Sequence, residues 1–294
     1  VLWRRTRPRG VVTTEALAQL TQLPVAGSLP DMGAVQVAEG QAQVTVGQTV
    51  LNPVDFTETT RLHRALTRNL HGALVLTSTV GDEGTTLMAT LLALKRAAGG
   101  KRTLLVDLNL KNAAITEAFG LKPCAWELAP VKGKTTGRTG AKAFAMADVI
   151  ARKAGAYELD VLPMPSDKTT LDLLTTSGGA AALFDGLSSA YEHIIVDTTP
   201  LMAHNRQNAD PVLLAAAANR TALVVLMRRT PAGHIMQAAT QLSASGAHIA
   251  GLVANNRYNP SPRTVLMHLA RTLGYVAPAM ASWLRAKVIR SGLE

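Results

Sequence analysis

The sequence predicts an α/β fold, a doubly wound and mostly parallel sheet with helices on both faces. Short apolar runs, the length of buried parallel strands, alternate with longer stretches of helical spacing. Several of these runs end at a polar or acidic residue, as strands beside a ligand crevice do. The expected strands cover residues 73–77, 103–106, 159–162, 193–196, 222–227 and 249–254.

Length and composition agree with one large domain and a shorter appendage. The chain has 294 residues, 47% of them hydrophobic and 17% charged, which is enough apolar sequence for a substantial core. A single cysteine excludes an intramolecular disulfide and a cysteine-based zinc cluster. The histidines lack the spacing of a dedicated metal site. We expect no uninterrupted apolar run of about 18 residues, and hence no membrane span within this sequence.

The formal net charge of +10 raises the question of an anionic partner. The cations are dispersed, however, which makes nucleic acid an unlikely partner. The dense cluster Arg4–Arg9 follows Trp3, a pattern typical of the cytoplasmic flank of a membrane helix. A solvated basic tail explains the same residues, and both interpretations stay open.

The beginning of the chain differs from the rest. Residues 1–55 are rich in Gly, Gln and Pro, and we interpret them as a connector or docking segment that precedes a domain of residues 56–294. Within the connector, residues 14–20 are expected to form a helix capped by Thr13 or Thr14. Residues 23–30 are expected to form a short extended piece. Residues 56–70 then have the apolar spacing of an amphipathic helix.

The segment from Thr77 to Thr86 occupies the place of a phosphate-binding loop. It follows an expected strand and leads into a helix at residues 85–98, as the motif G-x-x-x-x-G-K-[ST] requires. Gly84 and Thr86 match that motif, but Thr85 stands where the lysine belongs. The letters G-K-T-T recur at Gly133–Thr136, but without a preceding buried strand, so we expect a solvated loop there.

Two aspartates, Asp107 and Asp197, end two of the expected parallel strands. Because the carboxyl ends of parallel strands meet at one edge of a sheet, these residues and the loop are expected to converge in one crevice.

In the order of these elements the chain resembles the cytoplasmic domain of bacterial tyrosine kinases of the capsule and exopolysaccharide chain-length system. These kinases have a P-loop NTPase-like fold and are related to the Min and Par positioning ATPases. The resemblance spans residues 56 to 280 and rests on motif positions that follow in the same order. They are Arg64, Leu66, Asn69 and Leu70; Thr77, Ser78, Glu83, Gly84 and Thr86; Asp107, Leu110 and Lys111; Asp197, Thr198 and Pro200; and Asn255 or Asn256 with Arg257.

The departures from the family pattern lie in the phosphate-binding loop and in the D-x-D segment. The loop's usual glycine is Asp82, its lysine is Thr85, and the second aspartate of the family's D-x-D segment is Asn109. Phosphoryl transfer depends on charge neutralisation, which these changes reduce. On the helix that family members use for ring assembly, Arg61 and Thr67 replace motif residues, which weakens that route of self-association.

The resemblance implies a pseudokinase that acts as a regulatory or assembly module of a polysaccharide copolymerase. It would lie on the cytoplasmic face of the bacterial inner membrane, with membrane-embedded copolymerase or synthase components as partners, possible self-association, and membrane contact through the basic N-terminus. One alternative is an active ATP-dependent tyrosine autokinase, and a second is a Par/Min-like positioning ATPase.

The cofactor implied by the resemblance is either none or weakly bound MgATP or MgADP. No residue is expected to be catalytic with certainty, and Asp107, Asn109 and Asp197 are interpreted as vestiges of a catalytic site. If nucleotide binds, the contacts are expected from Gly81, Gly84, Thr85, Thr86, Asn255 and Arg257, and Mg²⁺ from Thr86, Asp107 and Asp197.

Overall fold

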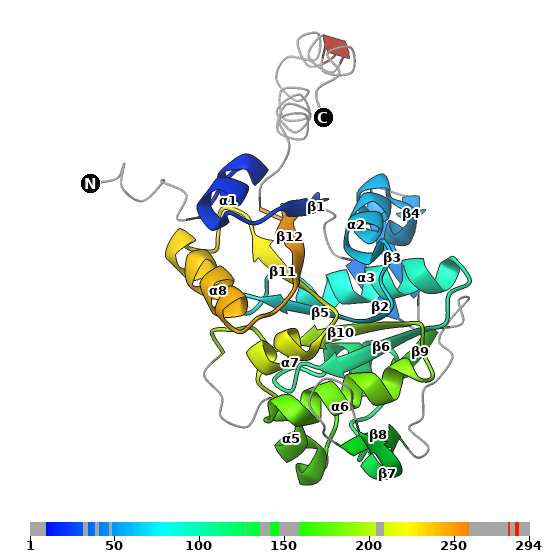
Figure 1. The fold of residues 1–294 in the computed structure, drawn as a ribbon. Helices are drawn as coiled ribbons and strands as arrows, with labels where there is room; N and C mark the ends of the chain where they lie inside the picture. The colour runs from blue at the N-terminus through cyan, green and yellow to red at the C-terminus, as the bar shows by residue number, and fades with distance from the viewer. Residues whose placement is uncertain are drawn as a thin grey trace.

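The computed structural model of the chain is shown in Figure 1. It describes residues 10–31, 35–38, 41–46, 49–126, 128–135, 142–146, 159–203 and 209–258, together with residues 282, 286 and 287. The basic cluster Arg4–Arg9 lies outside these residues. Within the described residues, no helix combines the length and apolarity needed to cross a membrane.

Helices and strands alternate along most of the described chain. In order, they are α1 (Thr14–Thr21), β1 (Val25–Leu29), β2 (Val35–Ala38), β3 (Gln41–Val46), β4 (Thr49–Leu51), the 3-10 helix η2 (Pro53–Asp55), α2 (Thr57–Thr67), β5 (Gly72–Ser78), α3 (Thr85–Ala98), β6 (Thr103–Leu108), α4 (Ala114–Ala118), β7 (Leu128–Thr135), β8 (Lys142–Met146), β9 (Leu159–Leu162), α5 (Lys168–Leu174), α6 (Ser177–Ser188), β10 (His193–Thr198), α7 (Pro211–Ala217), β11 (Arg220–Leu226), α8 (Ala232–Ala244) and β12 (Ile249–Asn255).

Seven strands form the central sheet, in the order β1-β12-β11-β5-β10-β6-β9. Every neighbouring pair is parallel, so the expected mostly parallel sheet is confirmed. All six strands expected from the apolar runs are present in it. The parallel register places the ends of β5, β6, β10, β11 and β12 at the same edge.

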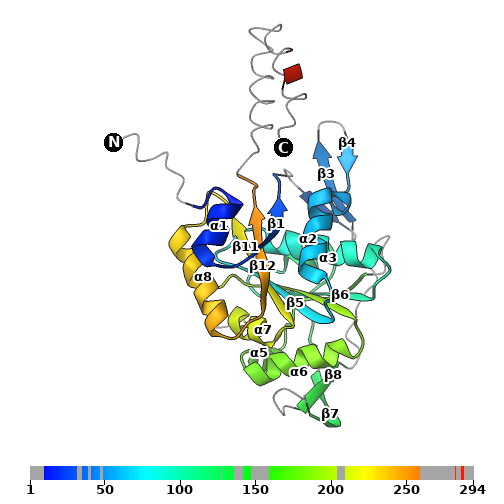
Figure 2. The same cartoon turned by 45° about the horizontal axis from the view of Figure 1, so that its top comes forward.

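Helices cover both faces of this sheet (Figures 1 and 2). One apolar core unites the sheet with α1, α6, α7 and α8, through residues such as Leu17, Phe184 and Leu242. The other unites it with α2, α3 and α4, through residues such as Leu66, Leu91 and Ile115. The structure is therefore doubly wound, because strands that are apolar on both sides need a helical layer on each.

The segment expected to be a connector contributes to this main fold. Strand β1 lies beside β12 at the edge of the sheet, with Val25 opposite Leu252 and Leu29 opposite Asn255. Helix α1 packs against α8, and the Thr13 hydroxyl accepts a hydrogen bond of 3.1 Å from the Ala16 amide, which confirms the expected cap. Residues 10–29 therefore belong to the same layered structure as the rest.

Two small antiparallel sheets complete the fold, one of β2, β3 and β4 and one of β7 and β8. Gly133, Lys134 and Thr135 lie in β7, which pairs with β8. The expectation of a loop was wrong there, because the polar residues form a hairpin strand. This strand leads into its antiparallel partner and not into a helix, so the G-K-T letters do not form a phosphate-binding loop.

Candidate functional site

A loop of six residues joins β5 to α3 at the carboxyl edge of the sheet. Two of its residues have left-handed backbone conformations, Asp82 at φ 63° and Gly84 at φ 90°. Gly84 is the N-cap residue of α3. A side chain at this position would be strained by the positive φ and would also meet Asn255, because a Cβ there would lie 2.5 Å from Asn255 Nδ2.

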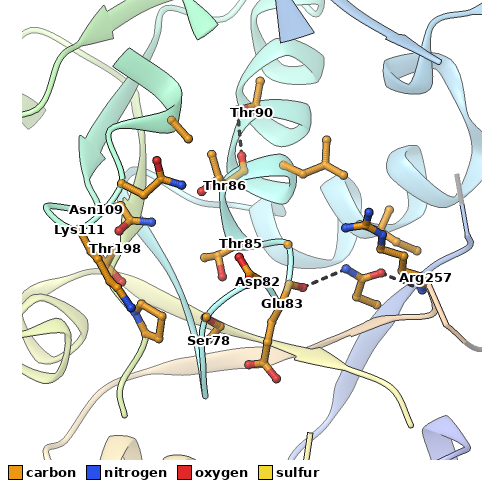
Figure 3. A pocket seen from close by; sticks show the side chains of 18 of the residues that line it. Ser78, Asp82, Glu83, Thr85, Thr86, Thr90, Asn109, Lys111, Thr198 and Arg257 are labelled. Carbon is orange, nitrogen blue, oxygen red and sulfur yellow. Dashed lines mark hydrogen bonds between the residues drawn. The ribbon is translucent and has the colours of Figure 1, made fainter. Parts of the chain in front are cut away.

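The loop borders an open cavity of about 950 Å³ (Figure 3). Strand ends and connections far apart in sequence contribute to its wall. They include Leu29, Pro30, Asn109, Lys111, Asn112, Ala114, Ala118, Thr198, Pro200, Asn255, Arg257 and Tyr258. Asn109 lines the cavity. So do all six residues that were expected to contact a nucleotide, which are Gly81, Gly84, Thr85, Thr86, Asn255 and Arg257. The loop therefore meets the ends of β6 and β10 at one edge of the sheet, as expected, but the buried Asp107 and Asp197 do not line the cavity itself.

Thr85 begins α3 at the position of the missing lysine. Its side chain is buried, with a residue exposure of 6%, and in Figure 3 it lies beside Thr86 at the start of the helix. A threonine brings no charge to this point. The positive end of the helix dipole is then the main electrostatic attraction for an anion at the loop.

Thr86 and Asp197 meet at the base of the site. The Thr86 hydroxyl donates a hydrogen bond of 2.6 Å to Asp197 Oδ2, while Asp197 Oδ1 has no partner among the described residues. The pKa of Asp197 is raised to about 8, mainly by burial and also by the negative charge of Asp107, against the lowering effect of hydrogen bonds from Thr86 and Asn109. The Asp197 carboxyl is therefore largely neutral at pH 7.

The Asp107 carboxyl forms hydrogen bonds with Thr116 and not with Thr86. Its Oδ2 accepts hydrogen bonds from the amide and the hydroxyl of Thr116, at 2.9 and 2.7 Å, and its Oδ1 accepts one from the Asn109 amide at 3.2 Å. Burial raises the pKa of Asp107. These contacts fasten α4 to the end of β6, so a structural role accounts for the buried carboxyl.

The Glu83 carboxylate lies beneath the loop and not beside the phosphate position at the start of α3. In Figure 3 the Glu83 side chain points away from Thr85 and Thr86, beneath the loop. Its Oε2 accepts hydrogen bonds from the amides of Thr79, at 2.6 Å, and Val80, at 3.1 Å. An acidic residue in a loop is usually exposed, so the sequence does not reveal this burial; Glu83 is 1% exposed.

The other oxygen of Glu83 contacts the end of β11. Glu83 Oε1 accepts hydrogen bonds from the Thr230 hydroxyl and, at 3.4 Å, from the Leu226 amide. Burial raises the pKa of Glu83, against the lowering effect of these hydrogen bonds. Neither Thr230 nor Leu226 carries a sequence signal that links it to the loop.

Asn255 holds the loop from the opposite side. Its side-chain Nδ2 donates a hydrogen bond of 2.9 Å to the Glu83 carbonyl oxygen, and its Oδ1 accepts one of 3.0 Å from the Arg257 amide. The guanidinium groups of Arg229 and Arg257 lie 4.5 and 5.6 Å from the centre of the Tyr258 ring. Asn255 is therefore a support of the loop, whereas Arg257 and Tyr258 form part of the cavity rim.

The charges around the cavity are few. Among the described residues that line it, the cations are Lys111 and Arg257, and the acidic residues are Asp82 and the inward-turned Glu83. No group of three or more His, Cys, Asp or Glu side chains in the described part of the chain is arranged to hold a metal ion. Thr86 and Asp197 are adjacent, but the expected third ligand, Asp107, already has hydrogen bonds to both of its oxygens.

Comparison with known sequences finds bacterial tyrosine kinases. No protein-family model matches the chain. EpsB of Ralstonia solanacearum, a protein assigned as a tyrosine-protein kinase, is 24% identical over 256 residues, which are 85% of this chain and 32% of EpsB. The tyrosine-protein kinase CpsD of Streptococcus agalactiae is 24% identical over 182 residues, 62% of this chain and 74% of CpsD. The chain thus spans about a third of the length of EpsB.

Solved structures show the same fold. The kinase domain of the Escherichia coli tyrosine kinase ETK superimposes with a TM-score of 0.60 at 18% identity, covering 83% of this chain and 94% of that domain. The chimerical protein CapA2B2 gives a TM-score of 0.59 at 20% identity, covering 83% of this chain and 98% of its own. The chain is therefore a homologue of bacterial tyrosine-protein kinases, and it has their P-loop NTPase-like fold.

Proposed function

We propose that this chain is a pseudokinase module of a capsule or exopolysaccharide system. It acts by binding other components and does not transfer phosphate. The observation that carries the proposal is the buried Thr85 at the start of α3, where the motif requires a lysine. Phosphoryl transfer needs positive charge at the phosphates, and a threonine supplies none.

The carboxyl groups support the same conclusion. Magnesium with a nucleoside triphosphate takes oxygen ligands, but the Thr86 hydroxyl and Asp197 are hydrogen-bonded to each other at 2.6 Å, and Asp107 accepts hydrogen bonds at both oxygens. Asn109 stands in place of a further carboxylate and is uncharged. The N-terminus of α3 attracts a phosphate group through its helix dipole, whereas the side chains around it bring neither the loop lysine nor the full set of carboxylates that MgATP needs.

The names of the relatives and the family resemblance support a setting for the module. EpsB and CpsD are named as tyrosine-protein kinases, and the family that the sequence resembles serves capsule and exopolysaccharide synthesis. We place the module at the cytoplasmic face of the bacterial inner membrane. Its partners there are membrane-embedded components of a polysaccharide copolymerase or synthase, and its function is assembly or regulation.

Isothermal titration calorimetry tests the proposal directly. We expect no binding heat and no thermal shift when the full chain is titrated with MgATP or MgADP up to millimolar concentration. Binding with a micromolar dissociation constant would overturn the proposal. A solved kinase domain with an intact loop lysine serves as the positive control under the same conditions.

A second candidate function is an active tyrosine kinase that uses a displaced cation. The observation that favours it is the presence of Lys111 and Arg257 in the wall of the cavity, where either side chain is available to compensate for the missing lysine. This candidate predicts that incubation with MgATP produces phosphotyrosine, detected by mass spectrometry. It further predicts that Asp197→Asn abolishes the product, whereas the pseudokinase predicts none from either protein.

A further inference from the structure

We propose that Glu83 is a positioning residue that couples the loop at residues 79–84 to the docking of residues 10 and 11 on the turn between β11 and α8. This turn consists of residues 226–231 and is the 226–231 turn. The proposal concerns the conformation of the loop and does not depend on whether nucleotide binds. Three consecutive sets of contacts connect the loop to residues 10 and 11.

The first link lies within the loop. Glu83 Oε2 accepts the amide hydrogens of Thr79 and Val80, so the carboxylate closes the loop upon itself. In many loops of this kind, amides at the start of the loop point to solvent or to a bound anion. Here the Glu83 carboxylate accepts hydrogen bonds from two of these amides. The conformation of the loop therefore depends on the position of this carboxylate.

The second link joins the loop to the 226–231 turn. Glu83 Oε1 accepts hydrogen bonds from the Thr230 hydroxyl and the Leu226 amide. The turn is itself ordered by the Thr230 amide, which donates to the Leu226 carbonyl oxygen at 3.0 Å. Because Glu83 is buried, losing these donors would leave its Oε1 without a hydrogen-bond partner in the protein interior. The position of the Glu83 carboxylate therefore depends on the position of the 226–231 turn.

The third link joins the turn to the beginning of the described chain. The Arg228 amide donates a hydrogen bond of 2.8 Å to the Val11 carbonyl oxygen, and Gly10 forms an antiparallel bridge with Pro231. Arg228 has a left-handed backbone, φ 65°, which turns its amide out of the strand direction. A Cβ at position 10 would lie 2.5 Å from the Thr230 carbonyl oxygen. Only a glycine approaches the turn this closely.

Asn255 provides a parallel connection between turn and loop. Its carbonyl oxygen accepts a hydrogen bond of 2.9 Å from the Met227 amide, and its side chain donates to the Glu83 carbonyl oxygen. Turn and loop are thus linked through the Glu83 side chain and through the Glu83 backbone. The sheet adds a third connection, because Val224 of β11 pairs with Ser78, the last residue of β5. The Glu83 side chain is the link that reaches the Thr79 and Val80 amides.

Amide hydrogen exchange of the full chain, read by mass spectrometry or NMR, tests the coupling. We expect Gly10→Ala to speed exchange at Thr79 and Val80 by about fivefold or more, the lower end of typical coupling free energies. The matched control is Gly233→Ala, at the start of α8, where an added Cβ meets no atom within 4 Å. The control is expected to leave the loop unchanged.

The reverse perturbation keeps the test decisive if Gly10→Ala fails to fold. Thr230→Val removes the hydroxyl and keeps the shape, and we expect faster exchange at Thr79, Val80 and the Arg228 amide, because coupling is reciprocal. Thr230→Ser retains the hydroxyl and is expected to restore protection at all three. The proposal is overturned if Thr230→Ser behaves like Thr230→Val, or if a folded Gly10→Ala speeds exchange in the 226–231 turn and leaves the loop protected.

Discussion

The hydroxyl of Thr86 and the carboxyl of Asp197 form a hydrogen bond of 2.6 Å that fastens the first turn of α3 to the end of β10. The Asp197 side chain is completely buried, and its pKa is raised to about 8. The folded state therefore binds a proton at Asp197 at pH values where the unfolded chain has lost it.

This proton makes stability depend on pH in a definite direction. Because the folded pKa of Asp197 lies above that of an unfolded aspartate, about 3.9, its contribution to the free energy of unfolding decreases as the pH rises from about 4 to 8. We expect Asp197→Asn to remove this decrease. Chemical denaturation of both proteins at pH 5 and pH 8 measures it, and an unchanged difference between them at the two pH values would contradict the assignment.

Buried histidines are expected to act in the opposite direction at lower pH. Burial and the nearby charge of Arg96 lower the pKa of both His63 and His193 to about 4, and Arg96 Nη2 lies 3.0 Å from His193 Nδ1. A lowered folded pKa means that stability is lost as the pH falls from about 6.5 to 4.

We expect His193→Gln to reduce this loss by about 1–3 kcal/mol, since each pKa unit corresponds to about 1.4 kcal/mol. Urea unfolding of the two proteins at pH 7 and pH 5 is the measurement. The exposed His234, replaced by Gln, is the control. An identical loss of stability in wild type and His193→Gln would sink this prediction.

Replacing Thr85 by lysine tests whether the missing positive charge in the loop is what prevents nucleotide binding. We expect Thr85→Lys to tighten MgATP binding about tenfold or more, since a hydrogen bond to a charged group contributes about 1.5–3 kcal/mol. Thr85→Met, similar in length and uncharged, is expected not to do so. Calorimetry on both variants, with their melting temperatures as a check on folding, decides the point, and equal affinities would refute it.

The two glycines of the loop are expected to differ in their tolerance of a methyl group. Gly84→Ala should destabilise the protein by about 1–3 kcal/mol, because it adds a side chain at positive φ and displaces Asn255. Gly81→Ala should change stability by less than about 0.5 kcal/mol, because no atom lies within 4 Å of the added Cβ. Thermal unfolding of both variants compares them, and equal losses would argue against the loop geometry.

The buried hydroxyl of Thr116 is expected to contribute more to the free energy of unfolding than an exposed hydroxyl. Thr116→Val removes a donor to Asp107 and the acceptor of the Met164 amide, which lies 2.9 Å from the hydroxyl oxygen. We expect a loss of about 1–3 kcal/mol in the free energy of unfolding, because two buried polar groups lose a partner. Thr175→Val, at an exposed position, is the control. Denaturant titration gives both values, and a loss no larger than that of the control would contradict the structural role of Asp107.

The sequence predicted most of the central sheet because its signals are local. The helix at residues 85–98 has the predicted bounds, and β9 covers the predicted residues 159–162. Strand β1 was expected only as an extended piece, since nothing in residues 23–30 says that the segment pairs with β12. The hairpin of β7 and β8 was missed for the same reason. Its polar residues lack the alternation that predicts a half-buried strand.

By itself, the sequence determined the α/β class, the edge of the sheet where the site lies and the absence of a lysine at Thr85. These follow from residue type and order along the chain. Only the tertiary structure decided that Glu83 turns beneath the loop to Thr230, that Asp107 bonds to Thr116 and that Gly10 rests on the 226–231 turn. The direction of a side chain depends on partners more than a hundred residues away or on a backbone turn, and periodicity carries no information about either.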